Sequence, residues 1–167
     1  MTTVTPPSDC PSAPSTAWPT HWGRPTGFAW YVKPAALVTQ SRGTRGTLEA
    51  SLSVGRIVDA VLSACADDVA REGGLLILHD WRHITTWDAD ARRHMMQRVR
   101  DDSMRKIRRV VVVMNVSPII GAALQTACML YSLAGTPMQV SKDVTPILLQ
   151  YGIAPPGPLP ARLAGIA

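Results

Sequence analysis

The sequence predicts a small α/β domain with a mixed, mostly parallel sheet of about four to five strands and about four helices. Two short apolar runs support this prediction, residues 75–78 (Leu-Leu-Ile-Leu) and residues 110–113 (four valines). Strands of a parallel sheet that helices cover on both faces are continuously apolar. Polar residues and a helix start follow each run, and this alternation of strand and helix is typical of a parallel sheet.

The chain has 167 residues, of which 46% are hydrophobic and 17% are charged. We expect one domain at residues 26–152, between a disordered arm at 1–25 and an irregular tail at 153–167. The arm is rich in Pro, Ser and Thr and the tail is rich in Pro, and such segments bury little apolar surface. Trp18 and Trp22 in the arm are expected either to fold back onto the domain or to form a short binding motif.

The first half of the domain is predicted to hold two antiparallel strands and a helix. Residues 28–32 are aromatic and β-branched, residues 36–40 supply the second strand, and a Lys-Pro pair makes the turn between them. Apolar residues repeat at four-residue spacing over 57–69, which predicts a helix that ends near Arg71, before two glycines. For residues 48–54 two predictions stay open: a strand, or the beginning of this helix.

The second half continues the alternation. Thr85 with Asp88 resembles a capping box before a helix that begins near Thr86. Ser117 followed by Pro118 is a strong start signal for the next helix. In order, the expected elements are a strand at 75–79, a helix at 86–103, a strand at 107–114, a helix at 118–134, an edge strand at 138–140 and a helix at 143–151.

Composition limits the partners and the compartment. The formal net charge of +5 fits ordinary solubility, with an acidic partner as the alternative. Nucleic-acid binding is not expected, because no recognition helix or set of interleaved aromatic residues is evident. Cys10, Cys65 and Cys128 are odd in number and widely spaced, which favours reduced thiols and the cytoplasm. No apolar run reaches membrane-spanning length, and we expect neither a signal peptide nor a membrane partner.

The polar residues that follow the two apolar strands are the expected working surface, because α/β proteins bind ligands at the carboxyl ends of their strands. We expect no metal there, since His79 and Asp80 point to opposite faces of a strand. No catalytic or cofactor-binding motif is present, so the chain is predicted to be neither an enzyme nor a cofactor binder. His94 is expected on the surface, and the helix starts at Thr86 and Ser117 form a weak anion-site prediction.

The element order resembles the STAS domain, the fold of bacterial anti-sigma factor antagonists. Residues 75–80 are similar to the family's strand that ends in aspartate. Residues 88–91 (Asp-Ala-Asp-Ala) are similar to its Asp-Ser-Ser-Gly-like helix start, and residues 110–135 are similar to its valine strand and the helix that follows. The resemblance implies a non-enzymatic regulatory module that binds another protein. The family is switched by phosphorylation of a serine at that helix start. Ala89 occupies the matching position, so we expect the switch to be absent.

The resemblance places the docking face on the loop after residue 79 and on the following helix. Its partner would be a regulatory kinase or another signalling protein, and a homo-oligomer is a further prediction. Two alternatives stay open: a small-molecule or nucleotide binder with a cavity between the helix starts at Thr86 and Ser117, and a scaffold subunit that assembles through its arm. The expected partner-binding residues are Asp80, Arg82, Thr85, Thr86, Asp88, Asp90, Arg92 and Arg93.

Overall fold

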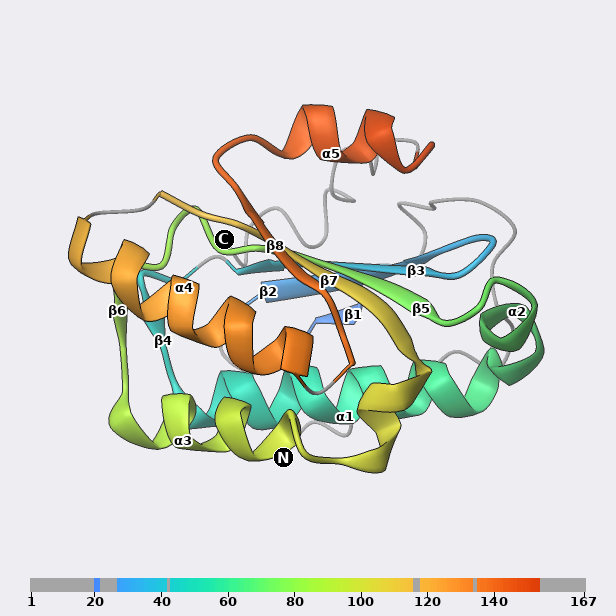
Figure 1. Cartoon of the computed structure of the whole chain (residues 1–167), viewed down its shortest axis with the longest axis horizontal. Coiled ribbons are helices and arrows are strands. Elements are labelled where there is room, and N and C mark those ends of the chain that lie inside the picture. Colours follow the sequence, from blue (N-terminus) through green and yellow to red (C-terminus); the bar gives the residue numbers. More distant parts are fainter. Residues whose placement is uncertain (1–19, 22–26, 42, 116–117, 134, 154–167) are drawn as a thin grey trace.

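The structure is a computed structural model that describes residues 20–21, 27–41, 43–115, 118–133 and 135–153 (Figure 1). Trp18, Trp22 and Ser117 lie outside the described residues, as do Cys10 and the tail beyond residue 153. The predictions made for them therefore stay predictions.

A mixed sheet forms the centre of the fold, with the strand order β1-β2-β3-β5-β7-β8. The first two pairings are antiparallel and the other three are parallel, which confirms the predicted α/β class. The sheet has six strands in the described part of the chain, because two residues of the expected disordered arm pair with β2. The strands are β1 Thr20–His21, β2 Gly27–Val32, β3 Ala36–Ser41, β5 Leu75–Asp80, β7 Ile107–Val113 and β8 Met138–Ser141.

Helices alternate with these strands. Residues 48–54, for which the sequence allowed either a strand or a helix, are part of the first helix. Thr47 caps this helix, since its hydroxyl oxygen accepts a hydrogen bond from the Ala50 amide at 3.2 Å, and a capped start favours helix over strand. The helices are α1 Leu48–Ala64, α2 Ala66–Arg71, α3 Ala89–Arg98, the 3₁₀ helix η1 Asp102–Lys106, α4 Pro118–Leu133 and α5 Val144–Gln150.

The predicted helix start at Thr86 is wrong. Residues Thr86–Trp87 form strand β6, which pairs in parallel with β4, Arg45–Gly46. The predicted capping box is also wrong, because the Thr85 hydroxyl donates to the Thr44 carbonyl and the Asp88 side chain caps no helix amide. Pairing with a strand distant in the sequence has overridden the local helix signal.

The sheet is covered on both faces. Helices α1, α3 and α4 lie on one face and α5 lies on the other (Figure 1). Side chains of β5 alternate accordingly, with Leu75 and Ile77 in the cluster beneath α1, and Leu76 and Leu78 in the cluster beneath α5. Ile153, predicted to begin the irregular tail, is buried in the α5 cluster.

Two further expectations are tested by the described residues. Cys65 is buried as predicted, but it is disulfide-bonded, so the expectation of a free thiol is wrong at this position. No helix in the described part of the chain has the length and apolar character needed to cross a membrane.

Candidate functional site

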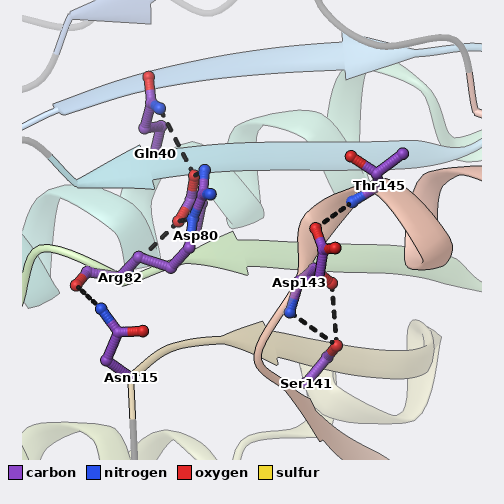
Figure 2. A network of polar contacts seen from close by, with 7 residues as sticks. All are labelled: Gln40, Asp80, Arg82, Asn115, Ser141, Asp143 and Thr145. Atoms are coloured by element: carbon purple, nitrogen blue, oxygen red, sulfur yellow. Dashed lines mark hydrogen bonds and ion pairs between the residues drawn. The ribbon is translucent and has the colours of Figure 1, made fainter.

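The parallel strands end at one edge of the sheet, and a polar network fills part of this edge (Figure 2). Asp80 at the end of β5 is only 4% exposed. Its two carboxylate oxygens accept hydrogen bonds from the Arg82 guanidinium at 2.9 and 2.8 Å, and Gln40 on β3 approaches at 3.5 Å. The Asn115 amide donates to the Arg82 carbonyl at 3.1 Å. The network therefore ties the loop after β5 to the ends of β3 and β7.

Charge and burial act in opposite directions on Asp80. Burial favours the neutral carboxyl, but the hydrogen bonds and the positive charge of Arg82 outweigh it, so the pKa of Asp80 lies below its usual value. Asp143 adds a second negative charge near Arg82. Its own carboxylate caps α5, accepting from the Thr145 amide at 3.1 Å. The bidentate pair of the buried Asp80 with the partly exposed Arg82 serves to fix the loop, because both carboxylate oxygens are already satisfied within the fold.

On the other side of β5, a second group of polar residues lies around the start of α3. Arg45 forms an ion pair with Asp88, and Asp90 pairs with Arg93 at 2.8 Å. Thr85 and Thr86 are exposed beside them. We call this surface the α3 face; it consists of Arg45, Thr85, Thr86, Asp88, Asp90, Arg92 and Arg93.

The structure therefore divides the residues that the sequence put together. Six of the eight expected partner-binding residues lie on the α3 face, whereas Asp80 and Arg82 lie on the α5 side of the sheet. Alternation along β5 directs Asp80 to the α5 side, because successive side chains of a strand point to opposite faces, and Arg82 lies there because it pairs with the Asp80 carboxylate. His79 packs on the α1 side and Asp80 on the α5 side, as the sequence predicted. That any of these residues contacts a partner remains a prediction.

Sequence reasoning missed an aromatic stack beneath the α3 face. The rings of His79 and Trp81 are stacked with centroids 4.8 Å apart, and Trp81 meets Trp87 edge-on at 4.7 Å. The Thr39 hydroxyl lies 2.6 Å from His79 Nδ1. Burial lowers the pKa of His79 to about 4, so its imidazole is neutral at pH 7. Trp87 reaches the stack only because β6 pairs with β4, and no local spacing signals that pairing.

His94, expected on the surface, is partly exposed on α3. Its Nδ1 lies 2.8 Å from the Ser51 hydroxyl on α1. Both residues, together with the aromatic stack, line a cavity of about 100 Å³ between the sheet and the helices. A second cavity of about 270 Å³ lies beside α5 and includes Asp80 and Arg82 in its wall.

Neither cavity is the one expected between two helix starts, because Thr86 is in a strand and Ser117 lies outside the described residues. The described residues contain no group of three or more His, Cys, Asp or Glu side chains placed to hold a metal ion.

Comparison with known proteins identifies one likeness of fold. No family profile matches this chain, and no curated protein matches it. A solved structure that is similar is that of an uncharacterized protein from the DUF3478 family of Shewanella loihica PV-4, described as having a SpoIIAA-like fold. The two chains are 12% identical, with a TM-score of 0.41, and the match covers 70% of this chain and 82% of the other.

Proposed function

We propose that this chain is a regulatory module without enzymatic activity that binds another protein through the α3 face. One observation carries the proposal: two segments, strand β4 and residues 85–93, bring seven polar side chains to one surface, and the two ion pairs among them are exposed or half-buried. The STAS resemblance supports the same surface, since it matches the helix start at residues 88–91 to the family's regulatory site. A signalling protein of the cytoplasm, such as a kinase, is the partner that the resemblance implies.

The energetics of the α3 face favour an intermolecular role. Surface ion pairs contribute at most about 1 kcal/mol to folding, and many contribute nothing measurable. The side chains of Arg93 and Asp90 are 69% and 61% exposed, so the fold gains little by holding them together. Their charges remain able to pair with charges on a partner, which would set the orientation and the rate of docking.

Binding is proposed to be constitutive. Ala89 is the first residue of α3 and is exposed, and alanine cannot accept a phosphoryl group. Asp88 and Asp90 on either side of it supply permanent negative charge near the amino end of the helix. Such charge stabilises a helix by roughly 0.3–1 kcal/mol for each residue, and beside the arginines that pair with it, it would present the partner with a fixed surface of mixed charge.

The test starts from affinity capture of partners and measures binding of the purified partner by calorimetry. We expect the double change Asp88→Lys, Asp90→Lys to weaken binding about a hundredfold, because it places like charges at the interface. The control is the double change Asp67→Lys, Asp102→Lys. It reverses two exposed carboxylates in the first turns of α2 and η1, far from the α3 face.

A thermal melt of each variant separates lost binding from lost folding. The first double variant should stay folded, since it gives up only exposed ion pairs and the helix-dipole contribution, roughly 1–2 kcal/mol in total. Unchanged affinity in a folded Asp88→Lys, Asp90→Lys variant would remove the α3 face from the interface. Equal loss of affinity in the control would show a non-specific effect of charge.

A further inference from the structure

We propose that the cavity beneath the α3 face is a binding site for a small, uncharged, planar aromatic molecule that carries one hydrogen-bonding group. The site lies beneath the proposed protein-docking surface and shares Arg45 with it. The cavity lies deeper, between the sheet and helices α1, α3 and α4, whereas the α3 face is on the outside.

The shape of the ligand follows from the walls. Five ring-bearing side chains line the cavity: His79, Trp81 and Trp87 form the consecutive stack described above, and His94 and Tyr131 complete the set. These rings contact one another, so a ligand ring would pack on the parts of them that line the cavity, and aromatic pairs add about 0.5–1.5 kcal/mol beyond the area they bury. Aliphatic side chains such as Val54 and Ile77 complete the walls. An aromatic ligand therefore fits this cavity better than a branched aliphatic one.

The size limits the ligand to about one ring. The cavity measures about 100 Å³. An engineered apolar cavity of about 150 Å³ in another protein binds benzene, and most drug-sized ligands occupy about 300–1,000 Å³. The cavity is therefore smaller than one that holds benzene, so a single six-membered ring with one small substituent is an upper limit and enters only if side chains of the wall shift.

The polar groups of the cavity define the hydrogen-bonding end and the charge. Ser51 and His94 form a hydrogen-bonded pair on the wall opposite the sheet, with the Ser51 hydroxyl oxygen 2.8 Å from His94 Nδ1. A hydroxyl both donates and accepts, and an imidazole ring carries two nitrogens that can hydrogen-bond, so this pair can receive one phenol-like group. The cations at the cavity, Arg45 and Arg98, already pair with carboxylates, Arg98 with both Asp59 and Asp101. No unpaired charge is therefore offered to an ionic ligand by these described residues.

The experiment uses the full chain and phenol as the probe, with saturation followed by calorimetry and by the fluorescence of Trp81 and Trp87. We expect one phenol per chain. Cyclohexanol, which has the same hydroxyl but a puckered ring, should bind about tenfold more weakly. Ala50→Leu places extra carbon atoms in the cavity wall on α1 and should weaken phenol binding about tenfold or more. Ala70→Leu adds the same atoms at an exposed position of α2 and should leave binding unchanged.

Ser51→Ala separates the hydrogen bond from the shape of the cavity. It should weaken phenol binding about fivefold and leave toluene binding almost unchanged, because toluene has no hydrogen-bonding group. If Ala50→Leu melts early, Val54→Ile replaces it as a smaller filling change. Absence of saturable phenol binding, or full-strength binding by a folded filling variant, would overturn the proposal. Equal binding of cyclohexanol would overturn the aromatic class.

Discussion

His79 is the residue at which burial, hydrogen bonding and ring packing meet. It is 8% exposed, lies within hydrogen-bonding distance of Thr39 on the neighbouring strand, and stacks on Trp81. All three interactions suit a neutral imidazole, because protonation would place a charge in a largely apolar cluster. The side chain therefore couples the end of the sheet to the loop that follows it, and does so only while it is uncharged.

We predict that His79 makes the fold sensitive to mild acid. Its pKa is lowered by burial to about 4, against about 6.5 in the unfolded chain. Below pH 6.5 His79 binds a proton in the unfolded chain but not in the native state. Its contribution to the free energy of unfolding is therefore fully present above pH 6.5 and falls as the pH drops toward 4. Between pH 7 and pH 5 the loss should be about 2 kcal/mol.

Urea unfolding at the two pH values measures this loss. His79→Gln is the comparison, since its amide can hydrogen-bond to Thr39 but does not titrate near neutral pH. The variant should be less stable at pH 7 and should lose much less stability on going to pH 5. Equal pH dependence in both proteins would show that other groups cause it.

At the scale of elements, the short pairing of β4 with β6 decides where α3 begins. Gly46 in β4 lies directly against the Trp87 ring in β6: a Cβ atom at Gly46 would lie 2.1 Å from Trp87 Cε3. The Asp88 amide also donates to the Gly46 carbonyl at 2.9 Å. The missing side chain at Gly46 therefore lets Trp87 fold inward onto Trp81.

We predict that Gly46→Ala displaces the Trp87 ring and weakens the edge-on contact with Trp81. The expected cost is roughly 1–3 kcal/mol, as for overpacking at other tightly packed sites, and the near-UV circular dichroism of the tryptophans should change. Gly43→Ala is the control, because the nearest atom to a Cβ there is 3.8 Å away. An unchanged spectrum and melting temperature for Gly46→Ala would contradict this account of the loop.

The same elements show what sequence can and cannot predict here. The runs at residues 75–78 and 110–113 identified β5 and β7, since continuous burial leaves a local mark in the sequence. Strand β6 left no such mark in the sequence. Its two residues pair with β4, and the paired residues Arg45 and Thr86 are 41 positions apart in the chain. The cavity was missed because the β4–β6 pairing that brings Trp87 to it could not be predicted from local sequence. Ser51 and His94 are also distant in the sequence, and they meet because α1 packs on α3.

At the scale of the whole molecule, the two faces of the sheet are covered unequally. Helices α1, α2, α3 and α4 and the 3₁₀ helix η1 lie on one face, whereas α5, with seven residues, is the one helix on the other face in the part of the chain that the structure describes (Figure 1). Ile147 and Leu148 of α5 are buried against Val111 and Val113 of the sheet. The stability of this face depends on few side chains, and each should matter more than its size suggests.

We predict that Leu148→Ala destabilises the protein by about 2–4 kcal/mol, the usual cost of removing a buried leucine side chain. Leu149 gives a matched control one residue away, because it is 76% exposed whereas Leu148 is 5% exposed. Leu149→Ala should change the free energy of unfolding by less than about 0.5 kcal/mol. Urea unfolding of both variants checks the difference. Since helix propensity changes equally in both, equal and small effects would mean that α5 is not packed on the sheet, and this face would then need another cover.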